Sequence, residues 1–110
     1  MKIAILLKSG PYTDEADRAL QTSMDMLAQD HKVTLFLLQE AVRFCRPKMK
    51  GAGYHDLKEL SHPNLEIYAL TQDAELRGLD VAAGGQPVLN GTYDSLIENM
   101  ESCDRVIGIL

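Results

Sequence analysis

The stretch KVTLFLL at residues 32–38 decides the fold class when it is set beside IAILL at residues 3–7. Both runs are continuously apolar, as strands buried on both faces of a sheet are, and the earlier run predicts the central strand. Between them, residues 14–29 place apolar side chains at the i, i+3, i+4 spacing of one helical face, with Thr13 as the candidate cap. A helix that returns the chain across a sheet makes the two strands parallel, so this stretch predicts a βαβ unit.

The rest of the chain continues this alternation of strands and helices. The expected helices are residues 39–45, 54–60, 73–76 and 92–102. The expected strands are residues 65–70 and a last buried strand at residues 105–110, while residues 81–91 should be mostly loop with a brief strand. Strands separated by helices predict a single domain over residues 1–110, an α/β protein with three α/β/α layers and a mostly parallel sheet of about five strands.

The composition is that of a folded, acidic domain. Of the 110 residues, 45% are apolar and 25% are charged, and the net charge is −5. The first apolar run is too short for a membrane span and lacks a cleavage site. The densest basic group is too small for a nucleic-acid-binding surface; it consists of Arg43, Arg46, Lys48 and Lys50. We therefore expect a cytoplasmic protein that binds neither nucleic acid nor membrane, with a small core that pairing between subunits would help.

Cys45 is the candidate catalytic thiol. Arg43 and Arg46 flank it, and nearby cations favour the thiolate that nucleophilic or sulfur-transfer chemistry requires. If residues 39–45 are helical, Arg43 and Cys45 point to different faces, and the thiol is then a small apolar core group. We favour the core role for Cys45 and a structural role for Cys103.

Other titratable residues give weaker signals. The two cysteines form no CxxC motif, and the spacing of His31, His55 and His62 matches no metal site. Neither a disulfide, a metal ion nor a cofactor is predicted, and a reducing compartment is expected.

The loop after the first strand is a candidate binding site because ligands of parallel sheets bind beyond the carboxyl ends of the strands. Its residues Ser9, Gly10 and Tyr12 precede a helix whose free amide groups could hold an anion. The loop contains neither GxGxxG nor GxxxxGKS/T, and a tight turn with a capping hydroxyl explains it more simply.

Four segments together resemble the DsrE/DsrF/DsrH family: GPYTDEADRAL, KMKGAGYHDLKEL, LEIYALTQDAELRGL and SCDRVIGIL. Their order and spacing match over nearly the whole chain. The family includes the YchN-like proteins and the subunits of the TusBCD and DsrEFH sulfur-relay complexes, which assemble as trimers, hexamers or heterohexamers. The resemblance implies a homo-oligomer, a trimer or a hexamer, with sulfur-relay proteins as partners.

The resemblance also locates a missing cysteine. In sulfur-carrying members, a cysteine seven residues before the arginine of an RG pair accepts sulfur as a persulfide. Counting back from Arg77 gives Leu70, and the second cysteine of YchN-like members falls on Asp73. A leucine cannot form a thiolate, so the segment looks similar to DsrH/TusB-like subunits, whose contribution is mainly to assembly.

Three functional hypotheses follow from these observations. The first is a DsrE-like protein of sulfur metabolism without the sulfur-accepting cysteine, an oligomeric binding or assembly subunit with pockets near the first loop and near Leu70, Asp73 and Arg77. The second is an active sulfur carrier or thiol enzyme that uses Cys45. The third is a small-anion or nucleotide-binding module that uses the helix N-terminus after Tyr12.

Overall fold

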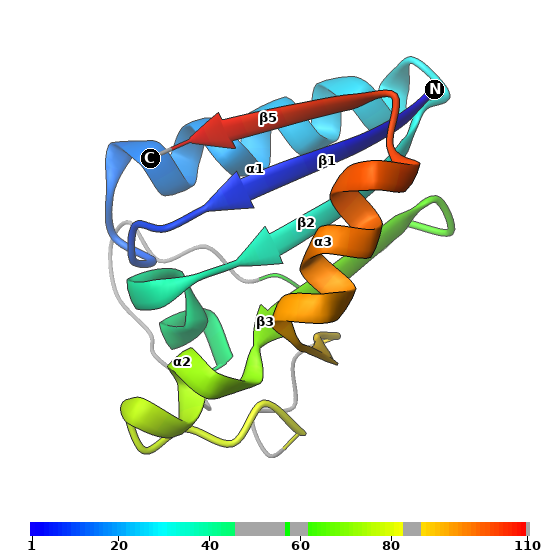
Figure 1. Cartoon of the computed structure of the whole chain (residues 1–110). Coiled ribbons are helices and arrows are strands. Elements are labelled where there is room, and N and C mark those ends of the chain that lie inside the picture. The colour runs from blue at the N-terminus through cyan, green and yellow to red at the C-terminus, as the bar shows by residue number, and fades with distance from the viewer. Residues whose placement is uncertain (46–56, 58–61, 83–86, 110) are drawn as a thin grey trace.

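The computed structural model describes residues 1–45, 57, 62–82 and 87–109. In chain order the elements are β1 (Lys2–Leu7), α1 (Asp14–Ala28), β2 (Lys32–Leu37), the 3-10 helix η1 (Gln39–Cys45), β3 (Leu65–Leu70), α2 (Thr71–Leu76), β4 (Leu89–Gly91), α3 (Tyr93–Ser102) and β5 (Arg105–Ile109). The strands form one sheet in the order β4-β3-β2-β1-β5, and every neighbouring pair is parallel (Figure 1). The predicted α/β class is confirmed.

The predicted βαβ unit forms the middle of the sheet. β1 pairs with β2 in parallel, with Ile5 opposite Leu35, and β5 pairs with the other edge of β1. β1 is therefore an interior strand, as predicted, although the middle position of the sheet belongs to β2.

Helix α1 covers one face of the sheet, and its start is fixed by Thr13. The hydroxyl of Thr13 accepts the N–H of Ala16 at 3.2 Å and donates to the carbonyl of Gly10 at 2.8 Å. The buried side chains of α1 join those of alternate strand positions in the hydrophobic core. Ile3, Ile5 and the strand residues level with them therefore face α1.

Helix α3 crosses the opposite face of the sheet (Figure 1). On this face Phe36 is fully buried and stacks on the ring of Tyr68, with the ring centroids 5.5 Å apart. A capping box begins α3, because Thr92 and Ser95 each bond the other's backbone N–H. The order of layers is thus α1, sheet, α3.

The sequence prediction of a buried last strand is wrong for the single chain. β5 is an edge strand, and none of its residues is buried. Helix α3 forms where it was predicted, yet it also has no buried residue. The brief strand expected within residues 81–91 is β4. Helix α2 ends at Leu76, and Gly78, with a left-handed φ of 68°, closes the turn after it as expected. The helix predicted at residues 54–60 lies outside the described residues except for Leu57, which is buried.

Gly91 is required where β4 passes the core. A Cβ added to Gly91 would lie 2.6 Å from the Phe36 ring and 3.3 Å from the carbonyl oxygen of Ala69. A Cβ added to Gly10, in contrast, would make only ordinary contacts at 3.7 Å or more.

We expect Gly91→Ala to destabilise the fold by about 1–3 kcal/mol, because the buried Phe36 ring and the backbone cannot both move away from the new methyl group. Gly10→Ala is the matched control and should unfold at nearly the wild-type denaturant midpoint. Chemical denaturation of the three proteins measures the difference, and equal midpoints for both variants would contradict the close approach at Gly91.

Candidate functional site

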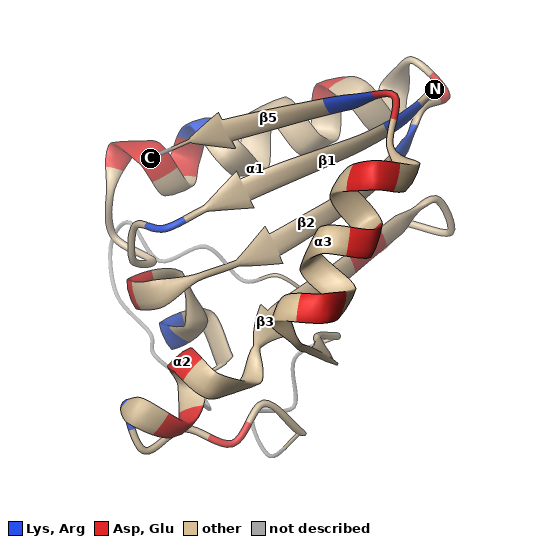
Figure 2. Ribbon diagram, viewed as in Figure 1, with Lys and Arg blue, Asp and Glu red and all other residues tan. Residues whose placement is uncertain are grey.

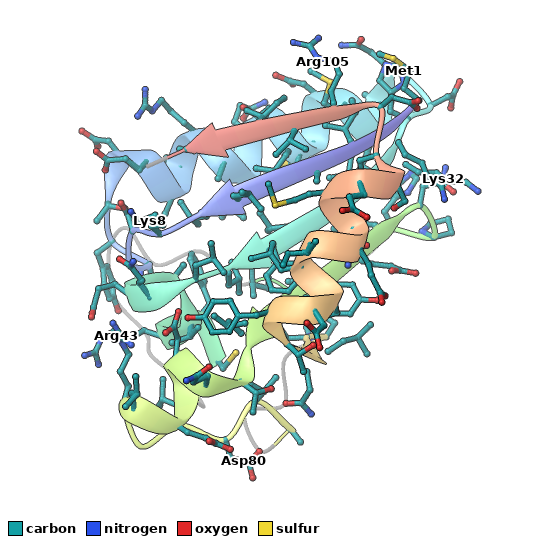
Figure 3. All side chains as sticks on the ribbon, in the orientation of Figure 1. Met1, Lys8, Lys32, Arg43, Asp80 and Arg105 are labelled. Atoms are coloured by element: carbon teal, nitrogen blue, oxygen red, sulfur yellow. The ribbon has the colours of Figure 1, made fainter. Side chains whose placement is uncertain are left out.

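The carboxyl ends of β1, β2 and β3 lead into three segments that meet at one edge of the sheet: the first loop, η1 and α2. A Cβ added to Gly10 would lie 3.7 Å from the carbonyl oxygen of Glu40, so the first loop packs closely on η1. Figure 3 shows Arg43 at this end of the sheet, on the same side as Lys8, whereas Met1 and Lys32 lie at the opposite end. The predicted location of the site, beyond the carboxyl ends of the strands, is therefore where these loops converge.

Asp73 ties α2 to the turn after β2. Its side chain is 9% exposed, and its Oδ2 atom accepts the backbone N–H of Gln39 at 2.8 Å. Gln39 has a φ of 48°, a left-handed conformation that costs energy for a residue with a side chain. The hydrogen bond from Asp73 helps to hold Gln39 in that conformation, so Asp73 is a positioning residue for the start of η1.

Glu40 lies between two arginines. Its carboxylate accepts from the Nε atoms of Arg43 and Arg77, the latter at 3.0 Å, and these hydrogen bonds lower its pKa. Arg77 also donates through Nη1 to the backbone carbonyl of Asp73 at 3.0 Å. The two predicted residues Asp73 and Arg77 are thus brought together, and Glu40, which the sequence reasoning missed, links them to η1.

Leu70 lines a different space, a cavity of about 440 Å³ between the starts of α2 and α3. The lining residues are Leu70, Thr71, Gln72, Glu75, Gly91, Thr92, Tyr93 and Asp94. None of these eight is a cysteine. Two of them, Glu75 and Asp94, carry carboxylates that oppose the binding of an anion or the formation of a thiolate nearby.

The α3 side of this cavity is not predicted by the sequence. The sequence predicts a loop and the start of an amphipathic helix at residues 91–94, and nothing in their spacing places them beside Leu70. Only the pairing of Leu70 with Gly91 in the parallel β3–β4 ladder brings them together. The one local signal is Gly91 followed by the helix-capping Thr92, which marks the start of a helix at this point of the chain.

Cys45 lies in the core of the domain. It is 1% exposed and belongs to the main hydrophobic cluster, and burial raises the pKa of its thiol to about 11. The flanking Arg43 is engaged by Glu40 instead of the thiol, and Arg46 is outside the described residues. These surroundings favour the neutral thiol.

Cys103 lies at the other end of the sheet from Leu70. It is half-buried and lines a cavity of about 300 Å³ near the amino ends of β1 and β2, together with Lys2 and Lys32. Neither cysteine therefore reaches the cavity beside Leu70.

The first loop is organised by local bonds. The Thr13 hydroxyl is used by Gly10 and Ala16, and Asp14, Glu15 and Asp17 place negative charge on the first turn of α1. These carboxylates compete with any anion for the helix N-terminus.

The two remaining predicted pocket residues also lie in this loop. Ser9 is half-buried and Tyr12 is about half-exposed, and neither lines the cavity beside Leu70. The predicted pocket is therefore divided in two: Gly10 approaches Glu40, whereas Leu70 lies beside the start of α3.

Among the residues that the structure describes, no three His, Cys, Asp or Glu side chains converge in a way that could hold a metal ion. No helix in the same part of the chain is long and apolar enough to cross a membrane.

An open, all-parallel sheet with helices on both faces and short helices above its carboxyl edge defines an α/β protein of the open-sheet class. The family follows from the sequence: the model of the DsrE/DsrF-like family matches residues 1–108, and this chain belongs to that family. The fold is similar to the crystal structure of the ychN protein from E. coli, with a TM-score of 0.85 and 24% identity over 98% of each chain. No curated protein matches the sequence. The resemblance inferred from the four sequence segments is confirmed.

The hydrogen bond from Gln39 to Asp73 can be tested by two substitutions. We expect Asp73→Ala to lower the free energy of unfolding by about 1–3 kcal/mol, because the N–H of Gln39 loses its acceptor in a partly buried position. Asp73→Asn keeps an oxygen that can accept the same bond and should lose clearly less. Urea denaturation measures both, and equal losses would show that the acceptor is not what stabilises the turn.

Proposed function

We propose that this chain is a DsrE-like protein of sulfur metabolism that lacks the sulfur-accepting cysteine and acts in the cytoplasm as an oligomeric binding or assembly subunit. Its membership of the DsrE/DsrF-like family supports the link to sulfur metabolism. Both cysteines are free thiols, in keeping with a reducing compartment.

The observation that carries this proposal is the lining of the cavity beside Leu70. Leu70 stands at the position where sulfur-carrying relatives are expected to have their cysteine, and an aliphatic side chain can neither ionise nor form a persulfide. Glu75 and Asp94 line the same cavity, and their negative charge would destabilise an anionic sulfur species there. The cavity is therefore suited to an uncharged or cationic group.

The alternative in which Cys45 carries sulfur receives less support. A sulfur acceptor needs an accessible thiolate at neutral pH, whereas Cys45 is buried and has a pKa of about 11. The alternative of an anion or nucleotide site at the first loop is opposed by the carboxylates of the first turn of α1. The hypothesis of a non-catalytic subunit requires neither an exposed thiolate at Cys45 nor an anion bound beside the carboxylates of α1.

Exposure of the folded protein to sodium polysulfide, followed by alkylation and mass spectrometry, tests whether the chain accepts sulfur. We expect no persulfide on Cys45, because a buried thiol with a pKa of about 11 is almost fully protonated at pH 7 and is shielded from the donor. The unfolded chain is the positive control, since its Cys45 is accessible. A persulfide that forms on Cys45 in the folded protein, and is absent from Cys45→Ser, would establish the sulfur-carrier alternative instead.

The assembly role predicts a defined oligomer, a trimer or a hexamer. A small domain leaves a large share of its surface exposed, and association buries part of it. Sedimentation equilibrium of the purified protein should give the mass of three or six copies at micromolar concentration. A monomer over the whole concentration range would remove self-assembly from the proposed function, and the sulfur-relay proteins expected as partners would then be the subunits to test by co-purification.

A further inference from the structure

A second cavity lies at the amino end of the sheet, opposite the end that carries Leu70. Its volume is about 300 Å³, near the lower limit of pockets that hold small molecules. Its walls come from the starts of β1 and β2, the turn before β3 and the last turn of α3, and they include Lys2, Lys32, Asn64 and Ser102. Figure 3 shows Lys32 at this end of the sheet. The function proposed above uses none of these residues.

Two lysines stand side by side on the floor of the cavity. Lys2 is the register partner of Lys32 in the parallel β1–β2 ladder, where neighbouring strands lie about 4.8 Å apart. Lys32 lies four residues before Phe36 in the same strand, so both lysines project from the α3 side of the sheet. Like charges directly opposite one another on neighbouring strands repel. The pair therefore destabilises the sheet unless negative charge lies close to both ammonium groups.

Neither lysine side chain has an ion-pair partner among the residues that the structure describes. The ion pairs found there are those of Glu40, at the other end of the sheet. Glu66 is the one carboxylate in the lining of the cavity, and its Oε2 atom accepts the hydroxyl of Tyr68 at 3.1 Å. Asp104 accepts the backbone N–H of Lys2 at 2.8 Å and does not line the cavity. Both ammonium groups are thus available to an anion that enters the cavity.

Helix α3 presents only uncharged side chains to this cavity. Figure 2 shows acidic residues along α3 and no basic one, and its three carboxylates are exposed: Asp94, Glu98 and Glu101. The residues of α3 that line the cavity are instead Asn99 and Ser102, three positions apart on one helical face. Asn99 donates one amide N–H to the carbonyl oxygen of Ser95 at 2.8 Å, which leaves its second amide N–H for a ligand. The wall beside the two lysines therefore offers hydrogen bonds without adding negative charge.

We propose that this cavity binds a small phosphate monoester, with the phosphate group between the ammonium groups of Lys2 and Lys32. A phosphate monoester carries nearly two negative charges at neutral pH, which matches the two ammonium groups and removes their repulsion. Lysine binds phosphate as a point charge, so the two flexible side chains need no fixed geometry. The side-chain amides of Asn64 and Asn99 then contact hydroxyl groups of the organic part. This site is separate from the cavity beside Leu70 and does not depend on the function proposed above.

A structural role for the two lysines makes a different prediction. Positive charge beside the C-terminal end of α3 offsets the partial negative charge of its carbonyl groups, and α3 has no basic residue in its last turn. In that role, Lys2→Gln and Lys32→Gln lower the stability of the ligand-free protein, and a phosphate monoester has no effect on the wild type.

The test titrates the nitrogen-labelled protein with glycerol 3-phosphate at physiological salt and follows the backbone amide signals by heteronuclear NMR. We expect saturable shifts at Lys32 and Asn64. Lys2→Gln and Lys32→Gln should each raise the dissociation constant about fivefold, the upper end of what one exposed ion pair contributes. Arg105→Gln is the matched control: Arg105 is exposed at the same end of the sheet, but it pairs with Ile3, whose side chain faces α1. Its loss should leave the constant unchanged, because salt screens charges on the other face.

The spectra themselves show whether each variant is folded, and added sodium chloride should weaken binding because it screens the attraction. Absence of saturable shifts in the wild-type protein overturns the proposal and leaves the lysines with the structural role at α3. An equal loss of affinity in Arg105→Gln also overturns it, because the attraction would then come from overall charge. Malate carries two negative charges without a phosphate group, and tighter binding of malate than of glycerol 3-phosphate overturns the ligand class.

Discussion

Parallel pairing of the buried strands β1, β2 and β3 is the constraint on which the rest of the structure depends. Their apolar side chains form the core with α1, and their shared direction brings all three carboxyl ends to one edge. The first loop, η1 and α2 can meet only because of this direction. The hydrogen bond from Gln39 to Asp73 and the bond from Arg77 to Glu40 then fix η1 and α2 to one another.

The same edge carries the observations behind the proposed loss of the family's sulfur chemistry. Leu70, Glu75 and Asp94 line the cavity beside α3, where the resemblance places the reactive cysteine of sulfur-carrying relatives. Cys45 is close in sequence to this edge but is packed into the core, where burial raises its pKa and favours the neutral thiol. These surroundings are the reason for proposing a binding or assembly role in place of sulfur transfer.

The two faces of the sheet differ in how many side chains they bury. The α1 face is a complete core, whereas α3 and β5 have no buried residue in the single chain. A subunit whose second face is finished by another molecule would combine a rigid sheet with a ready interface. This division agrees with the assembly role proposed above.

The sequence by itself determined the α/β class, the parallel βαβ unit, the Thr13 cap and the family, because buried strands and amphipathic helices leave periodic patterns that are local in the chain. Through the resemblance, the sequence also predicted that Leu70 stands where sulfur-carrying members have their cysteine. Only the tertiary structure decided that Cys45 is buried, that Glu40 links Arg43 to Arg77, and that Leu70 faces Asp94, because these are contacts between segments far apart in the chain or in different elements. The exposed β5 shows the same limit: an apolar run signals that a strand will be covered, but the sequence does not say by what.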